Sequence, residues 1–262
     1  MMHQVRVYDI PTRIFHWAFA FFFVFAFFIG KTVDDESLTF SYHMMAGIML
    51  SGMVILRLIW GFVGSRYARF QSFPLHPKEL IQYFQDIFKG SSRRFTGHNP
   101  ASSWAGLAML FLALGLGLTG YLMVNGYKES LEDVHEVLST LFVLVAIAHV
   151  VGIIFHTLRH KDPIGLSMIH GSKQVDQVTE QGISNSHPFI GILFVIILGY
   201  LAFSISKGFN PQTRVLSLFG QTLQLGENEN SEKQEDGSAQ SIQQVEGADT
   251  PVLKKDEDGD DD

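Results

Sequence analysis

Five apolar stretches, separated by polar or charged loops, run through most of the chain. They cover 14–30, 43–63, 104–124, 134–158 and 188–206. Each approaches the roughly 20 residues that a helix needs to cross a hydrocarbon core of about 30 Å. The polar stretch 64–103 has an apolar-periodic middle that predicts a short helix in the membrane interface. The pattern predicts an all-α integral membrane protein: a bundle of four transmembrane helices followed by a fifth.

The composition agrees with a membrane location and narrows the possible chemistry. The chain is 47% hydrophobic, contains 23 phenylalanines and has no cysteine. A chain without cysteine has no disulfides, iron–sulfur clusters, thiolate metal sites or covalently attached c-type haem. Any metal or cofactor must therefore be held by histidine, methionine or oxygen ligands.

Lysine and arginine in the short loops predict the orientation of the chain. Eleven of them would lie on one side, whereas the short loops of the other side contain only Lys31 and Lys128. Because positively charged loops stay in the cytoplasm, we expect a cytoplasmic N-terminus and a periplasmic C-terminus in a bacterial inner membrane. The first apolar stretch is longer than that of a signal peptide and lacks a cleavage site, so we expect it to remain as an anchor.

The sequence predicts four regions. A membrane domain of four helices covers 1–174, a cytoplasmic linker 175–187, a fifth transmembrane helix 188–206 and an acidic periplasmic tail 207–262. The tail supplies most of the net charge of −7. It has too little apolar surface to offset chain entropy, so we expect it to be disordered. Its charge is either simply solvated or serves in docking.

Histidines are the candidate functional residues. The chain contains eleven, and His16, His43, His135, His149 and His156 lie within the predicted spans. Ionisable residues at membrane depth are costly and mark functional sites, although a single one can be a hydrogen-bonded packing residue. His135 and His149 are 14 residues apart, so they project from nearly one helix face, about 21 Å apart along the axis. This spacing suits two haems stacked across a bilayer, one near each surface.

The haem near the outer surface needs two histidines at the same depth. His43 precedes Arg66 by 23 residues and His135 precedes Arg159 by 24, so both lie at one level, counted from the cytoplasmic ends of their helices. We therefore predict that His43 and His135 are the axial ligands of an outer haem.

The haem near the inner surface has one clear ligand, His16, and two candidate partners. The number of residues to the outer helix end is nearly the same for His16 and His149, which favours His149. The number of residues to the inner helix end is the same for His16 and His156, which favours His156. A haem at His156 would lie about 31 Å from the outer one, which is the whole hydrocarbon thickness. We choose His149, with His156 as the alternative.

Other residues at these levels fit the same arrangement. Arg57 follows His43 by 14 residues and is expected at the inner level, where it either binds a haem propionate or extends toward the cytoplasmic interface. Gly47, Gly106 and Gly120 would let a flat macrocycle approach a helix. Glycines also serve ordinary helix packing in membranes.

Five short motifs resemble those of the bacterial cytochrome b561 and nickel–iron hydrogenase b-type cytochrome family. Their order and spacing across the first four spans are specific to that family. They are VYDIPTRIFHW (7–17), LRLIWGFVGSRYARF (56–70), GHNP (97–100), VHE (134–136) and MIHGSK (168–173).

The resemblance implies transmembrane electron transfer through two bis-histidine b haems. It also implies a quinone at one face and a redox partner, a c-type cytochrome or a hydrogenase, at the other. Carried over by position, the ligands are His16, His43, His135 and His149. The fifth span and the acidic tail depart from the pattern, which leaves the partner open. No nucleic-acid partner is expected, and the protein would contact membrane lipid.

Two hypotheses for the function remain. In the first, the chain is an electron-transfer subunit with no bond-making site of its own, and His98 lies near the inner haem or a quinone unless it is only a loop-turn residue. In the second, the histidines relay protons or bind a metal ion in a transporter. A transporter should bury acidic residues beside the histidines, and Glu136 is the one candidate.

Overall fold

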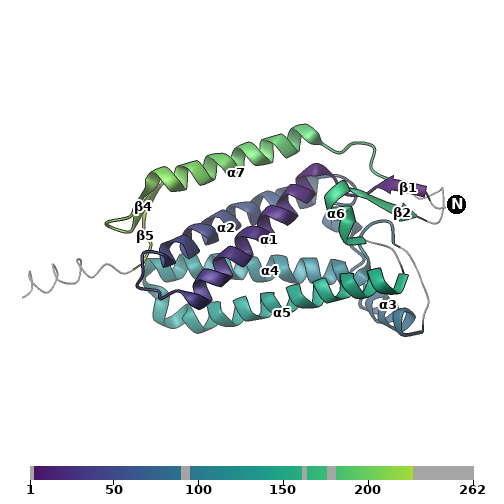
Figure 1. The fold of residues 1–262 in the computed structure, drawn as a ribbon, viewed down its shortest axis with the longest axis horizontal. Coiled ribbons are helices and arrows are strands. Elements are labelled where there is room, and N and C mark those ends of the chain that lie inside the picture. Colours follow the sequence, from purple (N-terminus) through teal and green to yellow (C-terminus); the bar gives the residue numbers. More distant parts are fainter. Residues whose placement is uncertain (1–2, 90–94, 161–163, 176–180, 227–262) are drawn as a thin grey trace, which may run out of the picture. The chain divides into compact units, whose positions relative to one another are not determined.

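The computed structural model describes residues 3–89, 95–160, 164–175 and 181–226, and these are mostly helical (Figure 1). The longer helices are α1 (Ile10–Thr32), α2 (Phe40–Val63), α3 (Pro77–Lys89), α4 (Pro100–Leu122), α5 (Lys128–His160) and α7 (Pro188–Gly208). The shorter helical elements are the 3-10 turns Phe70–Ser72 and Ile164–Leu166, the π-turn Met123–Tyr127 and α6 (Ser167–His170). The strands are β1 (His3–Arg6), β2 (Ser172–Val175), β3 (Phe209–Asn210), β4 (Val215–Leu218) and β5 (Gln221–Gln224).

Four helical stretches of the described residues are long and apolar enough to cross a membrane: Ile10–Thr32, Phe40–Val63, Pro100–Arg159 and Pro188–Gly208. The third is interrupted at Asn125 and Gly126, where the backbone is not helical and φ reaches +95°. Glycine adopts this conformation without a steric penalty. The chain reverses there, so that α4 and α5 lie side by side (Figure 1).

The helices α1, α2, α4 and α5 pack as antiparallel neighbours in fixed registers. In each antiparallel pair, residue numbers rise along one helix and fall along the other in the same direction. One contact between two helices therefore fixes which of their other residues lie at the same depth. The contacts that define the registers are Asp9–Trp60 and Ala26–His43 for α1 and α2, Thr119–His135 and Gly115–Leu138 for α4 and α5, and Phe23–Phe142 for α1 and α5.

Polar caps fix where α1 and α4 begin. The buried Asp9 accepts a hydrogen bond from the Thr12 amide at 2.8 Å and another from the Trp60 indole at 3.1 Å. Asn99 accepts from the Ser102 amide at 2.7 Å, and a proline follows each cap within the first helical turn. Such caps satisfy amides that would otherwise lack a partner. Asp9 thereby also joins the start of α1 to α2.

The segment that follows α5 returns to the start of α1. Strand β2 pairs antiparallel with β1, and the amides of Val7 and Tyr8 donate to the Gly171 carbonyl at 2.7 and 2.9 Å. Gly171 has φ +83°, and a Cβ there would lie 2.7 Å from the Tyr8 carbonyl oxygen. Only glycine fits this turn. Two motifs at opposite ends of the membrane domain, 7–17 and 168–173, therefore lie together.

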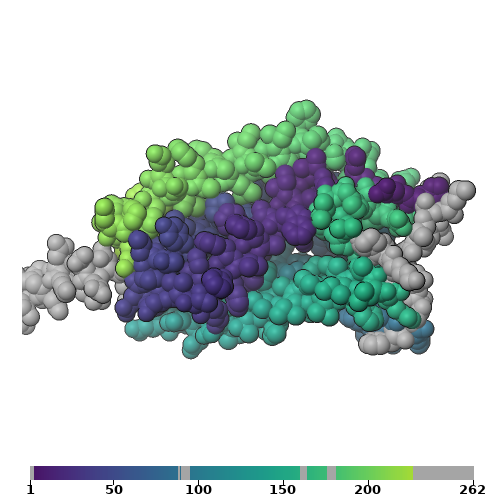
Figure 2. Space-filling view, in the orientation of Figure 1, coloured from purple at the N-terminus to yellow at the C-terminus, as the bar shows by residue number. Residues whose placement is uncertain are grey.

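Helix α7 lies along α1 and α2, as the green and purple-blue surfaces in Figure 2 show. Glycines permit the close approach. A Cβ at Gly52 of α2 would meet Leu201 at 2.7 Å, and one at Gly191 of α7 would meet Ile10 at 2.5 Å. Small residues at helix crossings are a usual means of packing in membranes.

The prediction of disorder from residue 207 onward is wrong for 209–226. These residues form the antiparallel sheet β3–β4–β5. Phe219 and Gly220, with φ of 51° and 81°, make the two-residue turn between β4 and β5, and this conformation matches the twist of a hairpin. Leu216 and Leu225 are fully buried against α2 and α7, so the sheet has an apolar core that the acidic composition concealed. Residues 227–262 lie outside the described part.

We predict that Asp9→Ala lowers stability by about 2 kcal/mol, because it removes a helix cap and the bond to the Trp60 indole. Asp9→Asn keeps an oxygen that can cap the helix but replaces the charged acceptor of the Trp60 indole by a neutral amide. The loss of stability in Asp9→Asn should therefore be smaller than in Asp9→Ala. The measurement is thermal unfolding of the purified protein in detergent. Equal melting temperatures for the wild type and Asp9→Ala would contradict this role of Asp9.

Candidate functional site

His43 on α2 and His135 on α5 face each other near the helix ends that the sequence assigns to the outer side. Their ring centroids are 6.2 Å apart, with an angle of 72° between the ring planes. Both side chains are partly buried. The structure thus brings together the two residues predicted as the outer pair.

Each of these rings is oriented by a hydrogen bond at Nδ1. His43 Nδ1 lies 2.8 Å from the Ala26 carbonyl oxygen, which can only accept. His135 Nδ1 lies 2.7 Å from Thr119 Oγ1, whose hydroxyl is 2.8 Å from the Gly115 carbonyl oxygen and donates to it. Nδ1 of His43 is therefore the protonated donor, and Nδ1 of His135 is the donor when the Thr119 hydroxyl donates to the Gly115 carbonyl; in that arrangement both Nε2 atoms have a free lone pair. A fixed tautomer of this kind is what a metal-ligating histidine requires.

His16 on α1 and His149 on α5 occupy the same level near the other end of the bundle. The register places Phe23 against Phe142, with ring centroids 3.9 Å apart. Seven residues farther along each helix, in opposite directions, lie His16 and His149. His16 Nδ1 is buried without a hydrogen-bond partner in the described structure.

His156 lies two turns beyond His149 on α5 and is buried, with 7% of its surface exposed. In the same register it is level with Asp9, the residue that caps α1. His16 is seven residues, or about 10 Å, farther along α1. The residue count from the inner helix ends favoured His156 as the partner of His16. The packing of α1 on α5 does not agree with that count, because it puts His156 level with Asp9.

The two pairs suit a metal that brings its own equatorial ligands. Two imidazoles bound to one metal at about 2.0 Å each have ring centres about 6 Å apart, as the outer pair does. Within the described residues, no three His, Cys, Asp or Glu side chains gather into a metal-binding group. A haem supplies four nitrogens and needs only two axial side chains. The residues present therefore fit a haem better than a bare ion.

Glycines leave room beside the histidines. A Cβ added at Gly47 or Gly106 would meet nothing within 4 Å, and one at Gly120 would meet only His135 Cε1 at 3.6 Å. At Gly30 it would lie 2.9 Å from the ring of His43, so that glycine is needed to seat the ring. Three of these four glycines were singled out in the sequence. Gly30 was not singled out, because it is the last residue of the first predicted span and so indicated only where that helix ends.

Arg57 turns toward the loop that follows α2. Its Nη2 donates to the Ala68 carbonyl at 3.1 Å and its guanidinium lies 4.9 Å from the ring centre of Phe70. The residue is only 8% exposed, and Nη1 is buried with no partner in the described structure. The direction is that expected for an arginine extending toward the cytoplasmic interface, while Nη1 keeps a free donor for an anionic group.

His98, in the loop before α4, lies at the same end of the bundle as Arg57. Its ring contacts those of Tyr8 and Phe73, with centroids 5.3 and 4.7 Å away. Burial, followed by the positive charges of Lys173 and Arg57, lowers the pKa of His98 to about 3. The rings of His149 and His16 also contribute to this shift. His98 is therefore a neutral, partly buried neighbour of the inner pair, with its Nδ1 atom shielded from solvent, and not a turn residue in solvent.

An aromatic cluster separates the two pairs of histidines. Phe142 is seven residues from both His135 and His149, is 3% exposed, and stacks on Phe23 and Phe19. Val54 and Ala113 complete this core. The cluster fills the middle of the bundle with apolar side chains.

Sequence reasoning missed Thr119 and the Ala26 carbonyl. A threonine in an apolar helix most often bonds a carbonyl of its own helix, as Thr119 also does. Its position on the face of α4 toward His135 becomes evident only from the packing of α4 on α5. The Ala26 carbonyl belongs to the backbone, and no sequence signal could have indicated it.

Long apolar helices that bring histidines together, as α2 and α5 do at His43 and His135, are typical of membrane-embedded haem proteins. The family model described as prokaryotic cytochrome b561 matches residues 7–171, which is more than half of the chain, and the chain belongs to this family. It is a multi-pass membrane protein of a b-type cytochrome family, and this class of cytochrome implies haem b.

Similar curated proteins are named as hydrogenase subunits. The "Probable Ni/Fe-hydrogenase 1 B-type cytochrome subunit" of Escherichia coli K12 is 26% identical over 146 residues, covering 47% of this chain and 61% of that protein. A "Probable Ni/Fe-hydrogenase B-type cytochrome subunit" of Rhodobacter capsulatus is 28% identical over 149 residues, with 47% and 54% covered. One of the same name from Bradyrhizobium diazoefficiens is 24% identical over 215 residues, with 65% and 86% covered.

The matched region of this chain thus spans little more than half the length of the first two relatives. No solved structure matches the chain. The family match ends at residue 171, before α7 and the sheet β3–β4–β5.

Because the pKa of His98 is about 3 in the folded protein and about 6.5 in an unfolded chain, the unfolded state binds the extra proton between these values. The stability contributed by neutral His98 is therefore complete above about pH 6.5 and falls as the pH drops toward 3. His98→Gln should lessen this loss by up to about 1.4 kcal/mol per pH unit. The measurement is unfolding at pH 7.5, 6 and 5.

His76→Gln, at an exposed histidine in the loop before α3, is the matched control for removing one imidazole. If His98→Gln has the same pH profile as the wild type, His98 is not the partly buried neutral group described here.

Proposed function

We propose that this protein transfers electrons across the membrane through two b haems, each held between two histidines. The outer haem would be bound by His43 and His135, and the inner one by His16 and His149. The observation that carries the proposal is the facing pair His43–His135, with ring centroids 6.2 Å apart and both Nδ1 atoms engaged. The register Phe23–Phe142 supports the second pair.

The side chains around each pair have distinct tasks. Ala26 and Thr119 hold the Nδ1 protons of the outer pair, so that Nε2 of each ring is presented to the iron. When bound, haem supplies a one-electron couple whose potential depends on its ligands, hydrogen bonds and exposure to solvent. Phe19, Phe23 and Phe142 keep the region between the pairs dry. The chain itself makes and breaks no substrate bond in this scheme.

Arg57 and His98 are proposed to face the propionates of the inner haem. Both have a buried nitrogen without a hydrogen-bond partner in the described structure, and Lys173 adds positive charge nearby. A carboxylate is the natural partner for such a group of donors. Arg57 can meet it through Nη1 while Nη2 remains on the Ala68 carbonyl.

The electron donors and acceptors follow from the family and from the relatives' names. We propose a membrane quinone as the reaction partner at one face. A hydrogenase subunit or a c-type cytochrome would be the partner at the other. The names of the relatives support the hydrogenase, whereas the departure of α7 and the tail from the family match leaves room for a different partner.

We propose that α1, α2, α4, α5 and α7 all span the membrane, with the N-terminus in the cytoplasm. The interruption at Asn125 and Gly126 makes two spans of the stretch from Pro100 to Arg159. The distribution of lysine and arginine then places β1, β2 and α3 on the cytoplasmic side and β3–β4–β5 on the periplasmic side.

Replacing either outer ligand should remove one haem and leave the other. For His43→Ala and His135→Ala we expect about one haem per chain in place of two, measured by pyridine haemochrome, with the remaining component unchanged in the reduced-minus-oxidised spectrum. Phe40→Leu, beside His43 but not a ligand, is the control. Loss of both haems from either variant would indicate a collapsed bundle and leave the ligand assignment unsupported.

The inner pair is tested by comparing His149→Ala with His156→Ala. The first should lose the inner haem, because His149 is level with His16. The second should keep both and at most shift the inner midpoint potential through a lost neighbouring contact. The readout is again haem per chain. Retention of two haems in His149→Ala with loss of one in His156→Ala would reverse the assignment.

A further inference from the structure

We propose that the C-terminal sheet β3–β4–β5 is a brace that positions His43 and so sets the properties of the outer haem site. The inference rests on the proposed function for its haem readout, while its structural part stands on contacts alone. The sheet lies beyond the region matched by the family, which ends at residue 171, so the brace is an addition to the membrane domain.

The start of α2 has only a weak side-chain cap of its own. Thr39, at the N-cap position, makes no capping hydrogen bond, and the Ser37 hydroxyl accepts from the Phe40 amide at 3.2 Å. Ser41, two residues before His43, is fully buried, and its hydroxyl donates to the Leu225 carbonyl at 2.6 Å. The turn that carries His43 is therefore also joined, through a buried hydrogen bond, to the residue that follows β5.

An apolar core joins the sheet to the same turn. Leu216 on β4 and Leu225 after β5 are both 0% exposed and form one buried cluster with Met49 of α2 and Ile205 of α7. Met44 and Met45, which directly follow His43, pack against this cluster. Full burial of two leucine side chains removes a large apolar area from water and is strongly stabilising, so the contact can hold the start of α2 in place.

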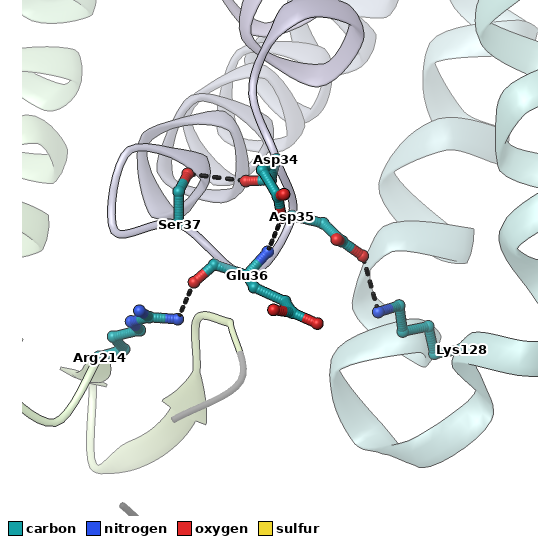
Figure 3. Close-up of polar contacts among 6 residues, drawn as sticks. All are labelled: Asp34, Asp35, Glu36, Ser37, Lys128 and Arg214. Atoms are coloured by element: carbon teal, nitrogen blue, oxygen red, sulfur yellow. Dashed lines mark hydrogen bonds and ion pairs between the residues drawn. The ribbon is translucent and has the colours of Figure 1, made fainter. Parts of the chain in front are cut away.

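The loop between α1 and α2 is tied down on both sides, as Figure 3 shows. Arg214, between β3 and β4, donates to the Glu36 carbonyl, and Leu225 in turn donates its amide to the Arg214 carbonyl at 2.7 Å. On the other side, Lys128 at the start of α5 lies 2.9 Å from Asp35, and this bond lowers the pKa of the Asp35 carboxyl.

A second ion pair lies next to His135, the residue that faces His43. Lys31, at the end of α1, pairs with Glu136, the residue next to His135. Strand β5 also contacts the turn between α4 and α5. The sheet and the outer loop thus connect the ends of all four helices that surround the outer pair. A histidine pair on helix ends needs such support, because a shift of about 1 Å is enough to impair a ligand geometry.

The experiment compares two shortened chains that differ only by the sheet. The chain ending at Gly226 keeps the brace and loses the acidic tail, whereas the chain ending at Gly208 loses both. In the first we expect both haem components and their midpoint potentials to equal those of the full chain. In the second the outer component should shift or be lost while the inner component is unchanged.

Point variants keep the test decisive if the shorter chain does not fold. Leu225→Ala should alter the outer component selectively, and the similarly sized Leu225→Met should restore it. Thr222→Ala, on the exposed face of β5, is the matched control. An unaltered outer component in both the chain ending at Gly208 and Leu225→Ala would overturn the proposal, as would a parallel change of both components.

A readout without haem separates this proposal from the proposed function. The chain has no natural cysteine, so Ser41→Cys introduces a single thiol under the sheet. A maleimide should label it about tenfold faster or more in the chain ending at Gly208 than in the chain ending at Gly226. Equal labelling rates would refute the brace even if both haems are present. Faster labelling in a protein that binds no haem would support the brace and refute the haem assignment.

Discussion

The antiparallel registers of four helices are the constraint on which the candidate site depends. The histidines come from three different helices, and none of them can reach its partner unless α1, α2 and α5 are fixed in depth. Asp9 with Trp60 sets α1 against α2, and the stack of Phe23 on Phe142 sets α1 against α5. The same contacts place a dry aromatic layer between the pairs. Packing in the apolar middle therefore determines chemistry at both ends.

Much of this arrangement could be predicted from the sequence, because hydropathy, loop charge and histidine spacing all measure depth in a membrane. The long helices and the meeting of His43 with His135 followed from these signals, whereas the family was indicated by the resemblance of five motifs. His149 was preferred to His156 from depth alone, and the stack of Phe23 on Phe142, which puts His16 level with His149, could not be foreseen in a chain with 23 phenylalanines. The direction of Arg57 depended on a backbone carbonyl at Ala68.

The sheet at the end of α7 was missed for a different reason. Its residues lie next to an acidic segment whose composition dominates any window that includes both, so apolar positions such as Leu216 and Leu225 appeared too few to form a core. These two leucines do not need further apolar residues within the sheet, since side chains of α2 and α7 form the other half of their buried cluster. Composition predicts whether a segment can fold alone, whereas this sheet folds against helices that precede it.

The spacing of His135 and His149 along α5 has an electrical consequence. Fourteen residues correspond to about 21 Å, or roughly two thirds of a hydrocarbon core of about 30 Å. With haems at both levels, an electron passing between them moves through that share of the membrane potential, a difference of about 1.6 kcal/mol for each 100 mV. Turnover would then be electrogenic. The transmembrane voltage would favour one direction of flow, and proton-motive force would be generated or consumed according to which face receives the electron.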